Sequence, residues 1–480
     1  MNKAVVLYIL GRILMFEALF LVLPLAVSVI YSESASIFAF SVTIAISLVL
    51  GILMSIKKPK NRSMYLREGF AITALSWLVI SIIGSIPFIL SGAIPSPVSA
   101  LFETVSGFTT TGASILSDVE SLDKGMLFWR SFTHWIGGMG VLVFLLMLKP
   151  ITGGSTVNLM KAESPGPQVE KLVPKLQSTA QILYAIYIVL TLLEMISLLI
   201  AGMTMFDAVT TALGTAGTGG FGIKNDSIAS YSPAIQWIVT IFMILFGVNF
   251  SAYFMLLLGK FKKAFAMEEV RWYFGIILLA IITIAFNIRG IYPTMSETIR
   301  QSAFQVGAII TTTGFSTTDF NLWPSTAKTI LVIIMFVGAC AGSTGGGIKV
   351  SRIIILFKTV KKELQYFLHP LRVSKTTLDK KSVAHNVVRS INVFMVAYIL
   401  IFVASVLLIS IDNYDLVTNF TATAATLNNI GPGLSLVGPM ENFSLFSDFS
   451  KLVLIFNMIA GRLEIFPILL LFKRETWKSF

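Results

Sequence analysis

Four short turns rich in threonine, asparagine and glycine are the residues of this 480-residue sequence that could do chemistry. They are Thr109-Thr110-Thr111-Gly112-Ala113, Gly217-Thr218-Gly219-Gly220-Phe221, Thr311-Thr312-Thr313-Gly314-Phe315 and Asn428-Asn429-Ile430-Gly431-Pro432. Glycine permits the positive φ and the close backbone approach that a tight loop needs. Four such loops that meet on one axis can aim carbonyl oxygens inward and replace the hydration shell of a cation. The turns therefore predict coordination of a dehydrated cation by backbone oxygens.

A short, partly apolar stretch precedes each turn. These stretches lie near residues 98–108, 206–216, 301–310 and 416–427. About 11 helical residues cover only ~16 Å, roughly half of the ~30 Å hydrocarbon core of a bilayer. Such stretches are typical of re-entrant pore helices, and their C-terminal ends, negative by the helix dipole, would point toward a cation. Phe102 to Gly112 aligns without gaps against Phe304 to Gly314, which indicates a repeated unit.

Ordinary surface turns, or contacts between helices through small residues, are the alternative interpretation of any one of these clusters. Four clusters argue against it, because each follows a half-length apolar stretch and each falls on the same side of the predicted membrane.

The composition identifies the lipid bilayer as the solvent of this chain. Hydrophobic residues make up 55% of it and charged residues 12%, with a mean hydropathy of +0.84, whereas soluble chains are roughly 25% charged. We predict ten spans, near residues 4–30, 37–56, 70–90, 132–148, 182–199, 235–258, 272–288, 330–357, 391–411 and 452–472. A signal peptide is the alternative for the first, but Arg12 and Glu17 interrupt its apolar run.

The basic residues predict the orientation. Most of the 36 lysines and arginines fall at the two termini and in the loops of one face, so this face and both termini are predicted to be cytoplasmic. The net charge of +12 is then a signal of topology, to which the surface for a cytosolic partner would add, and no nucleic-acid partner is predicted.

We therefore predict an all-α polytopic membrane protein with four helix–pore-helix–loop–helix repeats in a pseudo-fourfold arrangement around one pore. Two extra N-terminal transmembrane helices and a basic cytosolic loop precede the repeats, in residues 1–69. The repeats occupy residues 70–178, 179–269, 270–383 and 384–480, and the second helix of the third repeat is interrupted.

That interruption is the run Gly338-Ala-Cys-Ala-Gly-Ser-Thr-Gly-Gly-Gly347 in the eighth span. So many glycines disfavour a continuous helix, and a broken helix in a membrane usually lines a cavity. A nucleotide-binding P-loop is the alternative, because glycines 342 and 347 have nearly the right spacing. Ile348 stands where that motif needs lysine, and a membrane helix precedes the run where the motif needs a strand.

Arg462 lies halfway along the last predicted span. A mid-membrane arginine costs about 2.5–3.5 kcal/mol on insertion scales and normally faces the interior of the bundle with a partner. One interpretation is a buried ion pair with Glu464 or Glu194; the other is a positive charge that projects below the filter as a barrier to cations. Glu103 and Asp207 each follow a phenylalanine at the start of a pore helix, where carboxylates suit the helix dipole.

The turns, the pore helices and the interrupted span together resemble the membrane subunits of Trk-type potassium uptake systems, within the Trk/Ktr/HKT superfamily. The resemblance covers essentially the whole chain and implies a potassium filter centred on the four glycines, with carbonyl groups from the residues before them. The implied filter residues are Thr110, Thr111, Gly112, Thr218, Gly219, Gly220, Thr312, Thr313, Gly314, Asn429, Ile430 and Gly431. Glycine at all four positions fits the potassium-preferring pattern. The departures are Gly219-Gly220 and the Asn428-Asn429 pair.

The resemblance also implies how the pathway is gated and regulated. The gate would be an intramembrane loop below the filter, together with the side chain of Arg462. The loop comprises Gly342, Ser343, Thr344, Gly345, Gly346 and Gly347. A TrkA-like ring of cytosolic nucleotide-binding subunits would dock on the basic face near residues 349–381, in a homodimer of the bacterial inner membrane. K⁺ is the transported ion, and no organic cofactor is expected on this chain.

Two other classes of function are compared with this prediction. A secondary transporter of another cation or a small solute would bind at broken helices in two inverted halves, whereas these repeats run in one orientation. A membrane enzyme would need a nucleophile–base pair or a metal cluster. Cys340 is the single cysteine and the three histidines lie far apart in sequence, so no enzyme is predicted.

Overall fold

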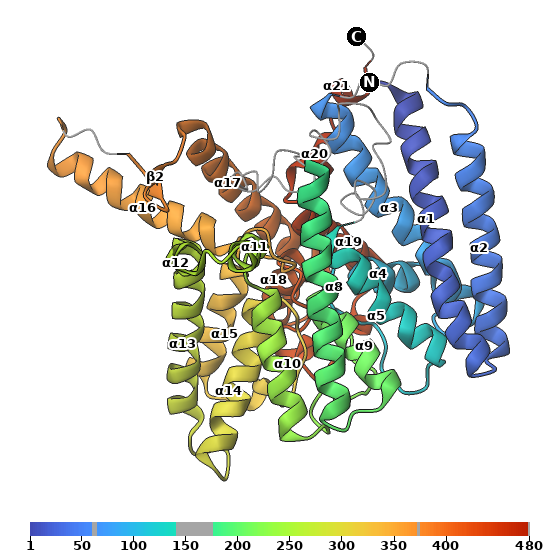
Figure 1. The fold of residues 1–480 in the computed structure, drawn as a ribbon, viewed down its shortest axis with the longest axis horizontal. Coiled ribbons are helices and arrows are strands. Elements are labelled where there is room, and N and C mark those ends of the chain that lie inside the picture. Colours follow the sequence, from blue (N-terminus) through green and yellow to red (C-terminus); the bar gives the residue numbers. More distant parts are fainter. Residues whose placement is uncertain (60–64, 141–175, 372–374, 479–480) are drawn as a thin grey trace.

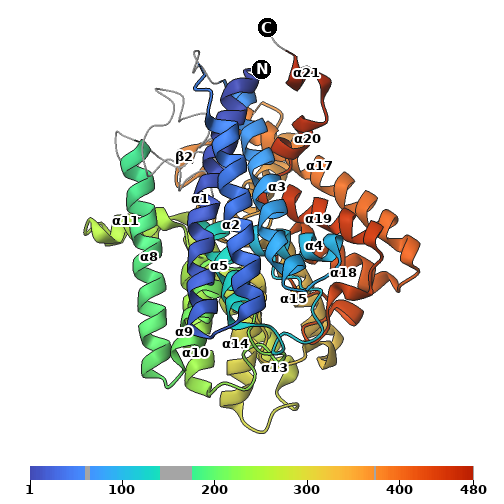
Figure 2. The same cartoon turned by 90° about the vertical axis from the view of Figure 1, so that its right-hand side faces the viewer.

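The computed structural model describes residues 1–59, 65–140, 176–371 and 375–478. Over these ranges the chain is a bundle of helices that run mostly along one direction (Figures 1 and 2). The described strands are β1 (Thr377–Leu378) and β2 (Lys381–Ser382), which form one antiparallel pair. The chain is therefore all-helical in its architecture, as predicted.

Six of the described helices are long and apolar enough to cross a membrane. They are α1 (Lys3–Ile30), α2 (Ser34–Ser55), α3 (Leu66–Leu90), α8 (Leu176–Ile200), α13 (Glu268–Ile288) and α17 (His385–Ile409). α1 and α2 lie side by side at one edge of the bundle (Figure 1). These helices confirm the first, second, third, fifth, seventh and ninth predicted spans.

A half-length helix follows each of α3, α8, α13 and α17, as the sequence predicts. These helices have 12 to 16 residues and are α4 (Pro97–Phe108), α9 (Met205–Ala216), α14 (Met295–Ile310) and α18 (Leu416–Leu427). We call them the short helices.

A second helix follows each short helix, and it is broken in the middle more often than predicted. The second helices are α5 (Lys124–Met139), α10 with α11 (Pro233–Phe246, Phe250–Leu257), α15 with α16 (Ser325–Val337, Val350–Leu368) and α19 with α20 (Asp448–Arg462, Phe466–Leu471). The predicted interruption of the eighth span is confirmed between α15 and α16. The remaining described elements are α12 (Phe261–Ala266), α21 (Arg474–Trp477) and four 3₁₀ turns, η1 (Phe320–Leu322), η2 (Ser410–Asp412), η3 (Ser435–Val437) and η4 (Phe443–Leu445).

The predictions of continuous spans over residues 235–258 and 452–472 are wrong. The chain bends by 92° between α10 and α11, where the side chain of Asn249 accepts a hydrogen bond from the first turn of α11 and starts a new helix. α19 ends at Arg462 because Glu464 and Ile465 adopt positive φ, at 55° and 70°. Of the predicted span 132–148, α5 covers the first part, and residues 141–148 lie outside the described residues.

The hydrophobic core lies between the short helices and the long helices behind them. Trp129 of α5 packs edge-on against Phe108 of α4 with ring centroids 5.8 Å apart, and its indole nitrogen donates to the Gly84 carbonyl at 3.0 Å. Phe102 and Phe304, the residues that align the two repeats, are completely buried. Burial of these rings fixes the short helices against their scaffold.

Both termini lie at one end of the bundle, and α16 projects from the same end (Figure 1). The amino group of Met1 donates to the Lys478 carbonyl at 2.6 Å, so the first and last described helices meet there. The turns after the short helices lie deeper, within the bundle, and these turns are the candidate site.

Candidate ion pathway

Each short helix begins with a side chain that caps it. The capping residues are Ser96, Thr204, Thr294 and Asp415, and each accepts a hydrogen bond from a backbone N–H of the first turn. Such caps satisfy one of the N–H groups that have no partner inside the helix. The four helices therefore start in the same way, and each ends directly at one of the predicted turns.

The four turns share one backbone conformation. The φ angle is 54–59° at the second turn residue, which is Thr110, Thr218, Thr312 or Asn429. It is positive again, at 77–100°, at the glycines two residues later, Gly112, Gly220, Gly314 and Gly431. In every turn the N–H of the intervening residue also donates back into the short helix at 2.8–2.9 Å. The doubled glycine of the second turn therefore leaves its register unchanged.

The four turns contact one another in chain order and close a ring. A Cβ atom on Gly112 would collide with the carbonyl oxygen of Gly219 in the next turn. The same relation joins Gly220 to Thr313, Gly314 to Ile430, and Gly431 back to Thr111. Each glycine thus has backbone against it where a side chain would stand, and carbonyl groups from all four turns are brought together.

Side-chain hydrogen bonds stabilise the turns from within and also join the fourth turn to the first. The hydroxyl groups of Thr109 and Thr111 lie 2.8 Å apart, as do those of Thr311 and Thr313. In the fourth turn the amide of Asn429 donates to the Thr111 hydroxyl at 2.9 Å and also to the Met458 carbonyl at 2.8 Å. The asparagine that departs from the threonine pattern therefore joins the fourth turn to the first.

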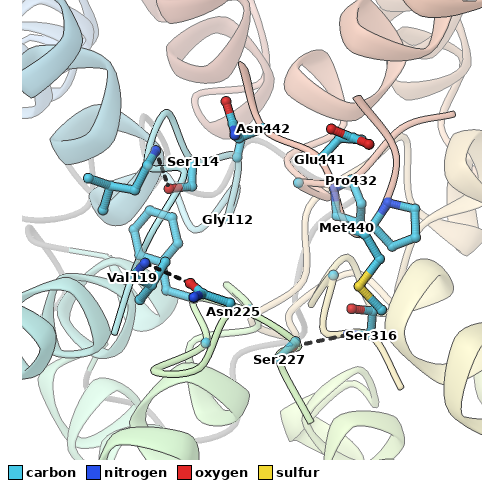
Figure 3. Close-up of a pocket in the computed structure, with 18 of the residues that line it drawn as sticks. Gly112, Ser114, Val119, Asn225, Ser227, Ser316, Pro432, Met440, Glu441 and Asn442 are labelled. Carbon is cyan, nitrogen blue, oxygen red and sulfur yellow. Dashed lines mark hydrogen bonds between the residues drawn. The ribbon is translucent and has the colours of Figure 1, made fainter. Parts of the chain in front are cut away.

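A cavity of about 160 Å³ opens on one side of the ring. Figure 3 shows the loops that follow the four short helices around it, with Gly112, Asn225, Ser316 and Pro432 among the labelled residues. Beside it, Asn225 donates a hydrogen bond to Asp118 at 2.9 Å, which lowers the pKa of that carboxyl below its usual value. The cavity is a polar mouth that leads to the ring.

A buried ion pair that the sequence analysis did not predict lies behind the first turn. Arg130 of α5 donates to the Glu103 carboxylate of α4 at 2.9 Å, and both side chains are at most 2% exposed. Arg130 also donates to the Gly222 carbonyl beyond the second turn, at 3.0 Å, and stacks over Phe221. The sequence predicts that Glu103 interacts with the helix dipole. In the structure its carboxylate instead holds the guanidinium of Arg130, which also contacts the segment after the second turn.

His134 joins α4 to the second turn through both ring nitrogens. Its Nε2 accepts a hydrogen bond from the backbone N–H of Phe221 at 3.3 Å, so Nδ1 carries the proton and donates to the Gly107 carbonyl at 2.8 Å. A histidine in an apolar sequence context gave no signal of this role.

The predicted gate residues lie directly against the other side of the ring. The backbone N–H of Gly346 donates to the Thr312 hydroxyl at 2.6 Å, and a Cβ on Gly346 would lie 2.6 Å from the Asn428 carbonyl oxygen. The Thr344 hydroxyl donates to the Phe246 carbonyl at the end of α10, at 3.3 Å. We call residues 342–347, the predicted gate, the gate loop; they contact the end of α10 and the third and fourth turns.

Arg462 lies between the gate loop and the first turn. Its guanidinium donates to the Thr110 hydroxyl at 3.2 Å and to the Thr344 carbonyl at 3.0 Å. It also donates to the carbonyl groups of Gly137 and Gly138, at the end of α5. Glu464, one predicted ion-pair partner of Arg462, forms an ion pair with Arg352 of α16.

Asp207, the other carboxylate expected to serve a helix dipole, lies in the first turn of α9. It accepts a hydrogen bond from the Tyr231 hydroxyl at 2.9 Å. Tyr231 lies in the loop after the second turn, so this carboxylate holds that loop to the start of its short helix.

Comparison with known proteins matches this arrangement to a family. The family model described as TrkH, cation transport protein, matches residues 35–479. The Trk system potassium uptake protein TrkH of Salmonella typhimurium is 37% identical over 96% of both chains, and TrkG of Escherichia coli K12 is 32% identical over 99% of both. The crystal structure of the potassium transporter TrkH from Vibrio parahaemolyticus covers 100% of both chains with a TM-score of 0.89 at 31% identity.

The fold is thus that of an all-helical, multi-span membrane protein of the transporter class. The chain belongs to the TrkH family of cation transport proteins. Membership of this family makes it a transport protein and not an enzyme.

Proposed function

We propose that this chain is a potassium uptake channel or transporter in which the four turns form the selectivity filter. The observation that carries the proposal is the closed ring, in which four turns of the same backbone conformation touch in chain order. The coordinating groups would be the carbonyl oxygens of Thr110, Thr111, Thr218, Gly219, Thr312, Thr313, Asn429 and Ile430. Carbonyl rings of this kind replace the hydration shell of K⁺.

The short helices support the same proposal electrostatically. Each ends at the ring, so four helix C-termini, each equivalent to roughly half a negative charge, face the proposed ion path. The polar cavity beside the ring would be the outer mouth. In this proposal the repeats take the predicted pseudo-fourfold arrangement, with residues 1–69 outside it and the repeats divided at the predicted boundaries.

Gating would be carried out by Gly342, Ser343, Thr344, Gly345, Gly346 and Gly347 together with Arg462. The gate loop lies against the ring opposite the polar mouth, so an ion that left the filter would meet it next. The positive charge of Arg462 beside Thr344 would add an electrostatic barrier. Displacement of the loop would open the path.

Regulation and assembly follow from the relatives and the basic face. The relatives are named as parts of a Trk system, and α16 carries Lys358, Lys361 and Lys362 at the end of the bundle that holds both termini. We infer that this end is cytoplasmic in the bacterial inner membrane and docks a ring of nucleotide-binding regulatory subunits. The chain would act as a homodimer with one pore in each protomer.

The broken helices are the one observation that favours the alternative, a secondary transporter of another cation or a small solute. Breaks follow α10, α15 and α19, and broken helices build the binding sites of many such transporters. In the proposed arrangement, however, the repeats have one orientation and their breaks lie beneath a ring of carbonyl groups.

Electrical recording separates the two. Purified protein in a planar bilayer, with K⁺ on one side and Na⁺ on the other, should give a reversal potential that follows the K⁺ gradient. A current that does not distinguish the two ions would overturn the filter. Uptake of an organic solute without ionic current would establish the alternative.

A further inference from the structure

Glu269 is a buried carboxylate to which the ion pathway described above assigns no role. It is the second residue of α13, and only 5% of its surface is exposed. Its position at the start of a helix would suit the helix dipole and would explain a carboxylate there. Its hydrogen bonds, however, go to other segments of the chain.

Three donors from three different segments converge on this carboxylate. The backbone N–H of Ala341 donates to Oε1 at 2.7 Å, and the backbone N–H of Ser351 donates to the same atom at 3.1 Å. The amide of Asn249 donates to Oε2 at 3.4 Å. Buried backbone N–H groups need such partners, and a charged acceptor makes the stronger bond.

The two backbone donors lie on either side of the gate loop. Ala341 immediately precedes the loop, and Ser351 lies in the first turn of α16, which follows it. One oxygen atom therefore holds both flanks of the loop together.

Asn249, the third donor, lies at the bend between α10 and α11. The backbone there holds the loop as well, since Phe250 donates to the Gly342 carbonyl at 3.0 Å and Cys340 donates to the Gly247 carbonyl at 3.1 Å. Glu269 thus lies where the start of the loop, the start of α16 and the bend of the second repeat meet.

We propose that Glu269 is the positioning residue that holds the gate loop in its obstructing place. Release of its bonds to Ala341 and Ser351, through a movement of α16, frees the loop. This inference rests on the proposed gate, and it adds the contact through which a regulatory subunit would act on that gate. We call the end of the molecule that is proposed to dock these subunits the regulatory end.

The connection to the regulatory end is direct. α16 extends from Ser351 past Lys358, whose ammonium group forms an ion pair with Glu268 at 2.5 Å and donates to the Thr377 carbonyl at 2.8 Å. Adjacent carboxylates of α13 therefore hold α16 at two levels, one at the gate loop and one nearer the β1–β2 pair. A partner that pulls on α16 from outside acts on both.

The test uses Cys340, which is the only cysteine of the chain and is completely buried beside the loop. Full-length protein in detergent is treated with N-ethylmaleimide, and the labelled fraction is followed by mass spectrometry. We expect E269A to raise the labelling rate at least about tenfold, because the flank that contains Cys340 loses its acceptor. E269Q keeps an oxygen that can accept from both N–H groups and should lie between E269A and wild type.

Two controls make the result specific. E297A removes a partly exposed glutamate of α14 that pairs with Arg300 of the same helix, and it should leave labelling unchanged. A C340S variant of each protein should give no label. The melting temperature of each variant shows that it is folded, and E269Q serves as the test if E269A does not fold.

Labelling and flux answer different questions. Unchanged labelling in folded E269A, or in E269Q where E269A does not fold, would overturn the role of Glu269. Faster labelling of E269A together with a higher basal K⁺ flux in vesicles would support both the role and the gate. Faster labelling with unchanged flux would keep Glu269 as the holder of the loop and would refute the gate assignment itself.

Discussion

The guanidinium of Arg462 lies 3.0 Å from the carbonyl oxygen of Thr344, so a fixed positive charge and the gate loop meet directly beneath the ring of turns. The charge belongs to the last residue of α19, and the carbonyl belongs to the break after α15. The end of α19 and the break after α15 therefore meet at one place beside the ring.

Replacement of Arg462 by alanine should raise basal K⁺ flux while the protein stays folded. A unit charge about 4 Å from an ion contributes about 4 kcal/mol at an effective dielectric constant of 20, and even a third of that changes a rate about tenfold. We expect an increase of at least about tenfold, measured as flux into vesicles under a K⁺ gradient. R462K, which keeps the charge, should stay near wild type. If R462A reduced the amount of folded protein but the folded fraction kept the wild-type flux, this role would be contradicted.

Substitution of Gly112 by serine should weaken discrimination against Na⁺. The side chain would strike the Gly219 carbonyl and would also require a left-handed backbone, which alone costs roughly 1–2 kcal/mol. Gly92 has the same φ of 78° with open space around it, so G92S is the matched control and should leave selectivity intact. The measurement is the K⁺/Na⁺ permeability ratio of each variant. An equal ratio in G112S and G92S would contradict the assignment of Gly112 to the filter.

Deletion of Gly345–Gly347 should shorten the gate loop and raise basal flux. The backbone of Gly346 contacts both the Thr312 hydroxyl and the Asn428 carbonyl, so the deleted residues are those nearest the ring. The single change G346A places a methyl group 2.6 Å from the Asn428 carbonyl oxygen and should displace the loop by a smaller amount. Flux that rises in the order wild type, G346A, deletion is the expected result; flux equal in all three, in properly inserted protein, would disprove obstruction by this loop.

Exchange of Glu103 for glutamine should destabilise the protein strongly. The change leaves the buried guanidinium of Arg130 without its carboxylate, and breaking a buried pair in this way costs about 3–5 kcal/mol. E297Q breaks a partly exposed pair within α14 and should cost at most about 1 kcal/mol. Melting curves of the two variants in detergent compare them, and equal melting temperatures would show that the Glu103–Arg130 pair adds nothing to stability.

The turns of the ring could be predicted from sequence because their chemistry is local. A short apolar stretch followed by threonines and a glycine specifies a helix, its end and a tight turn, and this pattern recurs with small changes. Contacts between distant segments gave no such signal. The bond from Asn429 to Thr111 and the pair of Glu103 with Arg130 join residues whose separation in the sequence carries no pattern.

The breaks at Asn249 and at Glu464 were missed for a different reason. Both lie within apolar runs that have the length of a membrane span, so hydropathy alone predicts continuous helices. Asn249 starts a new helix through its cap, and Glu464 has a left-handed backbone conformation beside its ion pair with Arg352. The glycine-rich run before Lys349 was recognised because its composition, and not its tertiary contacts, disfavours a helix.

The position of bound ions tests the central proposal most directly. Crystals grown with Tl⁺ or Rb⁺, which substitute for K⁺ and scatter anomalously, would locate the ions without reference to flux. We expect anomalous peaks on the axis enclosed by Gly112, Gly220, Gly314 and Gly431, within coordinating distance of the carbonyl oxygens that precede them. Ions bound at other positions, with none inside the ring, would contradict the assignment of these turns as the filter.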